Sequence, residues 1–157
     1  MGFVMIVLMS GFLVSATNST APATAYVTVN GFISLSLSPG SVTFGNMAPN
    51  ETKSATNNPL VVTIGSETNV DFVNITTKSN STVLKTIDGS NNFSVSNMSW
   101  DTNVTFPNPV NYSWWEKKVY LTSAYGQNYS IYHRLTIPLG QTAGFYITGI
   151  TITAKDD

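Results

Sequence analysis

The stretch Leu135–Ala154, LTIPLGQTAGFYITGITITA, constrains the fold more than any other part of this chain. It predicts a strand over Leu135–Ile137, a tight turn, and a long closing strand over Phe145–Ala154. The closing strand has alternating apolar and β-branched residues, a pattern that is typical of a strand with one buried face. Gly149, inside this strand, predicts a bulge or a close approach of another backbone. The chain is therefore expected to be all-β, with its last strand between neighbours from much earlier in the sequence.

The rest of the chain repeats this pattern of short strand-like segments. Turn signals recur about every 8–15 residues. This spacing favours an immunoglobulin-like or jelly-roll-type β-sandwich of roughly 8–10 short antiparallel strands. A length of 157 residues fits one such domain. A long polar loop is expected over Gly45–Pro59. The other expected strands are Ala25–Asn30, Phe32–Leu37, Val42–Phe44, Leu60–Ile64, Val70–Thr77, Val83–Ile87, Phe93–Ser96, Ser99–Trp100, Lys117–Thr122 and Tyr129–Ile137.

The N-terminal segment is of a different kind. Gly2–Ala16 is apolar and uncharged, and it is shorter than the roughly 20 residues that a transmembrane helix needs. Its length and Val14-Ser15-Ala16 match an export signal with a small-residue cleavage site, but no Lys or Arg precedes it. A retained helix in a filament core, a segment donated to a partner and a core helix of a cytosolic fold are the alternatives. We divide the chain into an export or assembly segment (1–16), a polar linker (17–24) and a sandwich (25–157), with membrane contact expected only through residues 1–16.

Charge and cysteine content exclude several functions. Charged residues make up only 10% of the chain and its net charge is −1. Without a basic patch to neutralise phosphates, nucleic acid is not an expected partner. Without cysteine there is neither a disulfide framework nor a thiolate nucleophile.

Glycosylation sequons are the most frequent motif. Nine of the sixteen asparagines begin an N-x-S/T sequon, whereas composition alone gives roughly four. This excess, together with the low charge, predicts a secreted or cell-surface glycoprotein, although a chain rich in Ser, Thr and Asn also produces sequons by accident. The candidate glycosylation sites are Asn18, Asn50, Asn74, Asn80, Asn92, Asn97, Asn103, Asn111 and Asn128.

No set of residues typical of catalysis is present. His133 is the only histidine and is expected to share a strand face with Ile131 and Leu135, so a partly buried strand residue is favoured over a general base. The motifs of serine hydrolases, P-loop proteins and dinucleotide-binding proteins are absent. Asp88–Asn91 could hold calcium but is favoured as a plain turn. We therefore expect no enzyme activity, no catalytic residues, no metal and no cofactor other than N-linked glycans.

The aromatic sequence NYSWWE contains the remaining candidate binding residues, Tyr112, Trp114 and Trp115. If this segment is a strand, Trp114 and Trp115 point to opposite faces, so one enters the core and the other is exposed. A local bulge that places both rings in the core is an equal alternative. An exposed ring could stack on a sugar or on another subunit.

Three motifs resemble those of secreted archaeal β-sandwich surface proteins. They are the turn in Ser38–Gly45, the strand in Asn58–Thr63 and the closing hairpin Ile137–Tyr146. The layout is also loosely similar to TasA- and camelysin-type fibre proteins and to archaeal bundling pili. The resemblance implies a β-sandwich outside the cell whose neighbours are joined by a donated strand, and it implies no catalytic residue.

These features together predict an extracellular structural protein of the cell surface. We expect a glycosylated filament or envelope subunit that self-associates through sheet edges or through a donated N-terminal strand from Met1–Asn30. The alternative is an adhesive or carbohydrate-binding module that uses Trp114 and Trp115. A secreted hydrolase is a third alternative, which the missing catalytic site disfavours.

Overall fold

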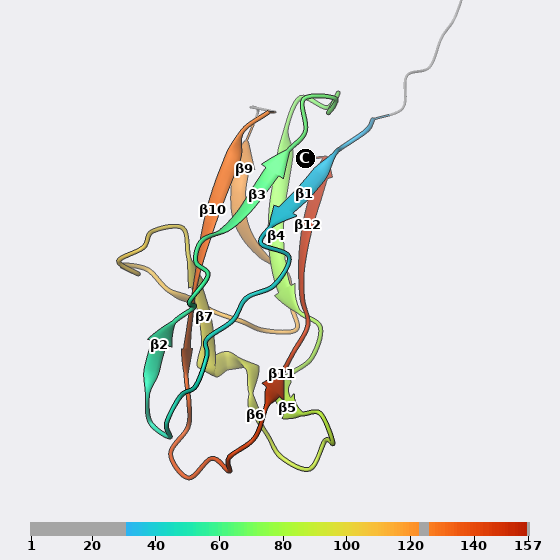
Figure 1. The fold of residues 1–157 in the computed structure, drawn as a ribbon. Helices are drawn as coiled ribbons and strands as arrows, with labels where there is room; N and C mark the ends of the chain where they lie inside the picture. Colours follow the sequence, from blue (N-terminus) through green and yellow to red (C-terminus); the bar gives the residue numbers. More distant parts are fainter. Residues whose placement is uncertain (1–30, 123–125, 157) are drawn as a thin grey trace, which may run out of the picture.

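A computed structural model describes residues 31–122 and 126–156, and these residues form an all-β sandwich (Figure 1). The predicted fold class is thereby confirmed. The only helical element among the described residues is a 3₁₀ turn, Val95–Asn97. The strands are β1 (Leu35–Ser38), β2 (Thr52–Ser54), β3 (Leu60–Ile64), β4 (Val73–Ser79), β5 (Val83–Thr86), β6 (Asn92–Ser94), β7 (Met98–Asp101), β8 (Val110–Asn111), β9 (Lys117–Thr122), β10 (Asn128–Thr136), β11 (Tyr146–Ile147) and β12 (Ile150–Asp156).

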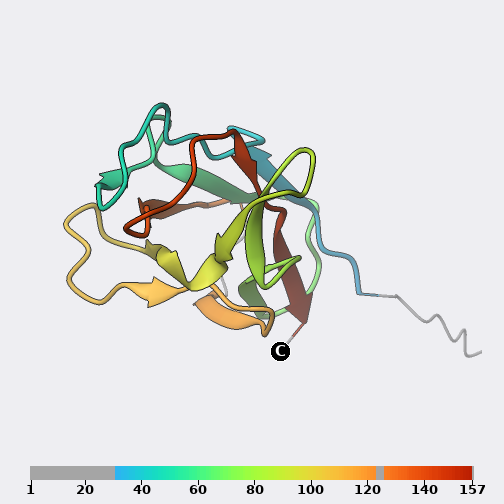
Figure 2. The same ribbon diagram turned by 90° about the horizontal axis from the view of Figure 1, so that it is seen from below.

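The strands form one large and two small antiparallel sheets. The large sheet has the order β1-β3-β10-β7-β8, with β2 also paired to β10. The small sheets have the orders β12-β4-β9 and β11-β5-β6. In Figure 1, β1 and β3 lie in front of β4 and β12, β10 runs along the left side, and the β11-β5-β6 sheet lies at the lower end. Figure 2, turned to look from below, shows the strands arranged around a common interior.

The interior is filled by side chains from all three sheets. β3 matches its predicted bounds, and the alternation of its sequence LVVTI places Leu60, Val62 and Ile64 inward, each no more than 2% exposed. From the opposite sheet, Val73 and Ile75 of β4 enter the same core. Burial of these apolar faces holds the large sheet and the β12-β4-β9 sheet together, because the inner face of each sheet is removed from water.

The C-terminal part differs from the prediction in two respects. Instead of one strand over Phe145–Ala154, the chain forms β11 and β12, which pair with different partners, β5 and β4. The break falls at Gly149. A Cβ added to this residue would lie 2.8 Å from the Asn80 side-chain nitrogen. The predicted close approach is therefore confirmed, although the approaching group is a side chain rather than backbone. Of the two neighbours predicted for the last strand, the structure shows one: β12 pairs with β4, and its other edge has no partner among the described residues.

Two further boundaries differ in the first half of the chain. Val42–Phe44 is not a strand, and β2 lies inside the predicted loop Gly45–Pro59. β2 forms because β10 is nine residues long and extends beyond the end of β3, so a second segment can pair with its remaining edge. This extra strand, the unpredicted short strand β8 and the split closing strand raise the number of strands above the predicted eight to ten.

The predictions for the N-terminus lie outside the described residues. They concern the apolar segment 1–16, the linker 17–24, the strand Ala25–Asn30 and the sequon at Asn18. Within the described residues, no helix has the length and apolar character to cross a membrane.

Candidate functional site

Along its whole length, one edge of β12 has no strand partner among the described residues. This strand pairs with β4 through seven consecutive residues, from Ile150 opposite Ser79 to Asp156 opposite Val73. No other strand in the described part of the chain pairs with β12. One side of its backbone therefore presents N–H and C=O groups that a further strand could bind.

The hydrogen bonds around β4 determine which groups of β12 face outward. The Ser79 N–H points away from β12 and donates to the Ser113 carbonyl at 2.9 Å, whereas the next N–H, of Asn80, donates to the Gly149 carbonyl at 2.8 Å. Backbone groups alternate between the two edges of an antiparallel strand. Lys78, Thr76 and Asn74 therefore bond to β12 opposite Thr151, Thr153 and Lys155. The outward N–H and C=O groups of β12 belong to the remaining residues, Ile150, Ile152, Ala154 and Asp156.

The other free edges are shorter or better protected. β8 has two residues and follows Pro109, and β1 has four residues and precedes Pro39, while β9 begins with Lys117-Lys118. Proline, charge and short length are the usual protections of an edge strand. β12 has no proline, and its one lysine, Lys155, is already engaged by Glu116 at 2.5 Å. Among the described edges, β12 is thus the most suitable for adding a strand.

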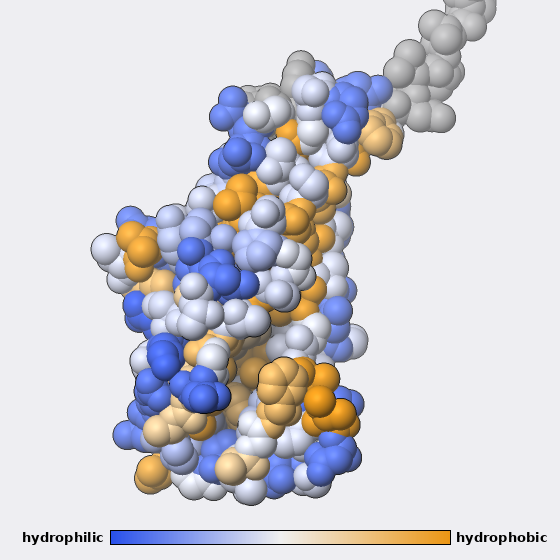
Figure 3. Space-filling model, viewed as in Figure 1, coloured by the Kyte–Doolittle hydropathy of each residue, from blue (hydrophilic) through white to orange (hydrophobic). Residues whose placement is uncertain are grey.

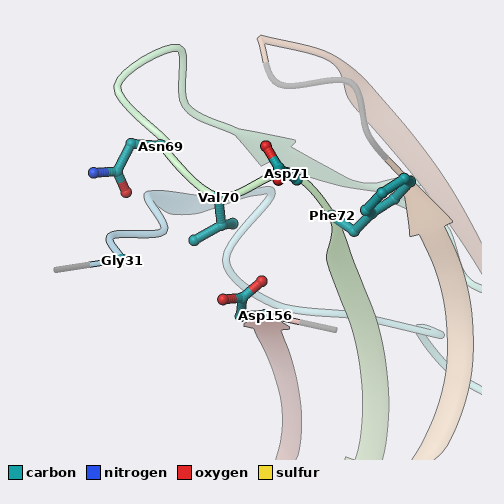
Figure 4. A pocket seen from close by; sticks show the side chains of 6 residues that line it. All are labelled: Gly31, Asn69, Val70, Asp71, Phe72 and Asp156. Atoms are coloured by element: carbon teal, nitrogen blue, oxygen red, sulfur yellow. The ribbon is translucent and has the colours of Figure 1, made fainter. Parts of the chain in front are cut away.

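A hollow of about 430 Å³ lies at the end of β12 where the described chain begins. Figure 4 shows Asp156 at the tip of β12, with Asn69, Val70, Asp71 and Phe72 on the segment that leads into β4. A Cβ added to Gly31 would lie 3.1 Å from Val70 Cγ1 and 3.9 Å from Asp156 Oδ2. The residues that precede Gly31 are therefore joined to the sandwich beside the C-terminal end of β12.

An aromatic groove of about 270 Å³ lies where the chain leaves β8. The indoles of Trp114 and Trp115 are 52% and 75% exposed, whereas Tyr112 is 2% exposed and contributes only to the floor. The prediction that at least one tryptophan enters the core is wrong. Residues 113–116 are not a strand, so strict alternation does not apply to the two rings, and Tyr112 occupies the core position instead. The groove is lined by Thr82, Ser94, Val95, Ser96, Tyr112, Ser113, Trp114 and Trp115.

A buried polar cluster lies beneath this groove. The Tyr112 hydroxyl and His133 Nε2 are 2.8 Å apart, and the Thr77 hydroxyl donates to the Tyr112 oxygen at 3.4 Å. His133 is 0% exposed, between buried Ile131 and Leu135 on the same face of β10. The predicted strand face is confirmed, and the burial is more complete than expected. The pairing with Tyr112 could not be derived from the sequence, because the partners are 21 positions apart with the strand β9 between them.

Burial also sets the protonation of this cluster. Removing the imidazolium from water lowers the pKa of His133 to about 4, against a small opposing effect of the Ile131 backbone. The backbone of His133 is fixed by the Asn58 side chain, which accepts from its N–H at 2.9 Å and donates to its carbonyl at 2.8 Å. A neutral, enclosed imidazole of this kind has no access to a substrate, so the geometry gives it a structural role.

Two carboxylates, Asp101 and Asp88, organise local turns and loops. Asp101 accepts the N–H groups of Asn103 and Asn108, both at 2.9 Å, and so organises the loop after β7. Asp88 accepts the Ser90 N–H in the predicted turn, and hydrogen bonds from Thr86 and then Ser90 lower its pKa. Within the described residues, no group of three or more acidic or histidine side chains could hold a metal ion.

The sequons are mostly at the surface. Six of the eight sequon asparagines that the structure describes are exposed, and the other two, Asn74 and Asn97, are half-buried. Asn74 lies in β4, which has a strand on each side, so its surroundings are the least accessible to a glycosylating enzyme. The exposed sequon asparagines are Asn50, Asn80, Asn92, Asn103, Asn111 and Asn128.

No protein-family model matches the chain, and no curated protein matches it.

Proposed function

We propose that this chain is an extracellular structural protein, a subunit of a cell-surface filament or envelope layer whose copies assemble by adding a strand to β12. The open edge of β12 is the observation that carries this proposal. Its sequence, ITITAKD, is rich in β-branched residues and long enough for a stable pairing. An exposed edge of this kind is normally avoided in monomeric proteins because it recruits other chains.

Residues Ala25–Asn30, AYVTVN, are the best candidate for the added strand. They alternate in the manner of a strand, and six residues match the seven of β12. Figure 1 shows β1 running opposite to β12, so the chain before Gly31 joins the sandwich at the end where β12 finishes. Each backbone hydrogen bond formed by the added strand contributes about 0.5–1.5 kcal/mol net, so a strand of this length can hold two subunits together.

The surface supports a role outside the cell. The chain has few charges with which to stay soluble, and the exposed sequon asparagines would place neutral, hydrated glycans over the surface instead. Figure 3 shows hydrophobic residues along the side of the molecule on which β1 and β12 lie. That side is the one that assembly would cover.

The substitution Ala154→Pro tests the assembly edge. The Ala154 N–H faces outward, so proline removes a donor needed by an added strand without breaking the pairing with β4. We expect filaments or large oligomers of the native chain to be replaced by monomers in size-exclusion chromatography with light scattering. Ala143→Pro, in the exposed loop before β11, is the matched control and is expected to assemble normally. Thermal unfolding by circular dichroism confirms that both variants fold, and a folded Ala154→Pro variant that assembles like the native chain would contradict the proposal.

A second candidate, a carbohydrate-binding module, is favoured by the groove at Trp114 and Trp115. Two exposed indoles beside serine and threonine hydroxyls provide stacking surfaces and hydrogen-bonding groups for a sugar. On a glycan array, the protein produced without glycosylation is expected to bind through Trp115, and Trp115→Ala is expected to lose most of that signal. Equal binding by the two proteins, or no binding by either, excludes this candidate.

A further inference from the structure

The walls of the aromatic groove are built from glycosylation sequons. Three of its lining residues, Thr82, Ser94 and Ser113, are the hydroxyl residues that complete the sequons of Asn80, Asn92 and Asn111. These sequons lie far apart in the sequence, in the loop after β4, in β6 and at the end of β8. The fold brings their hydroxyl groups to one groove, beside the two most exposed indoles of the described chain.

Asn111 directly precedes two residues that line the groove, Tyr112 and Ser113. The Tyr112 N–H donates to the Met98 carbonyl at 2.9 Å, so the pairing with β7 continues past β8 and the backbone stays extended. Successive residues of an extended chain point to opposite faces, so exposed Asn111 points away from the core position that buried Tyr112 occupies. The exposed Asn111 side chain makes no hydrogen bond within the described residues, and its amide is accessible to modification.

The other two sequon asparagines, Asn92 and Asn80, are less suitable attachment points for a glycan that would reach the indoles. Asn92 shares a face of β6 with Ser94 and is also exposed, but it is not next to the indoles in the sequence. The Asn80 amide oxygen accepts the Thr151 hydroxyl at 2.5 Å, which ties this side chain to β12. Asn111 is only three positions before Trp114, or no more than about 10 Å of extended backbone.

The chemistry of the groove fits a neutral sugar. No charged residue lines it, and its polar groups are hydroxyls that both donate and accept hydrogen bonds. An indole face is apolar, as is the C–H face of a pyranose ring, and stacking them removes both from water. Left uncovered, Trp115 would expose 75% of its surface, an unfavourable arrangement for a protein outside the cell.

We propose that the groove binds the chain's own N-linked glycan, which is attached at Asn111 and stacks on Trp114 and Trp115. This inference rests on the glycosylation that is part of the proposed function. The glycan completes the surface of the sandwich at this point and covers an apolar patch that the fold leaves open. A sugar from another molecule would then compete with a tethered one, whose effective concentration is far higher.

The test measures acrylamide quenching of tryptophan fluorescence in the glycosylated full chain. Trp100 is 4% exposed and shielded in every variant, so quenching reports on Trp114 and Trp115. We expect Asn111→Gln to raise the quenching constant about twofold, because loss of the glycan uncovers the indoles. Asn103→Gln, which removes an exposed sequon in the loop after β7, is the matched control and is expected to leave the constant unchanged.

Two further measurements make the result decisive. When both are produced without glycosylation, the native chain and Asn111→Gln should have equal quenching constants, since only the sugar distinguishes them. Peptide mass spectrometry shows whether Asn111 is occupied. An occupied Asn111 with no change in quenching overturns this inference alone and leaves the proposed glycosylated surface standing. An unoccupied Asn111 also overturns it, and empty sequons throughout the chain would remove the glycosylation on which both proposals draw.

Discussion

Lowering the pH from 7 to 4 is expected to reduce the free energy of unfolding by about 3 kcal/mol through His133 alone. In the folded chain burial lowers the pKa of His133 to about 4 from the ordinary value of 6.5. The unfolded chain therefore binds a proton below pH 6.5 that the folded chain does not bind until about pH 4. Stability is complete above pH 6.5 and decreases as the pH falls through this window. Urea unfolding at several pH values, followed by circular dichroism, measures the effect.

The double substitution His133→Leu with Tyr112→Phe isolates this contribution. It replaces both partners of the buried hydrogen bond with apolar groups, so neither is left unsatisfied in the core. We expect the variant to lose most of the stability change between pH 6.5 and pH 4, while the carboxylates, which titrate in both proteins, still contribute at lower pH. If the double variant and the native chain lose the same free energy over this interval, His133 is not the group responsible.

The sequence predicts the layers of this fold well because they follow from local alternation. Leu60–Ile64 and Lys117–Thr122 match their predicted bounds, since in each the residue pattern alone defines a strand. The closing strand was predicted less well. The turn and the β-branched residues identify its position, but its division follows from pairing with two different strands, β5 and β4, which no pattern within the strand reveals.

The sequence identifies the residues of the candidate sites but not how those residues are arranged in space. Trp114 and Trp115 are conspicuous in the sequence, yet their joint exposure depends on the bend that follows Tyr112. The open edge of β12 depends on which strands pair with which, and pairing over long sequence separations is not encoded in any one segment. The convergence of three sequons on one groove could not be seen before the fold was known.

Deleting residues 1–30 measures the central claim most directly, because it removes the proposed donor strand and leaves every described strand in place. We expect the native chain to form filaments visible by negative-stain electron microscopy. The shortened chain, Gly31–Asp157, is expected to be a folded monomer by light scattering, since its β12 edge would have no strand to bind. Filaments formed by the shortened chain would contradict the account, as would a native chain that stays monomeric at the concentration used for both.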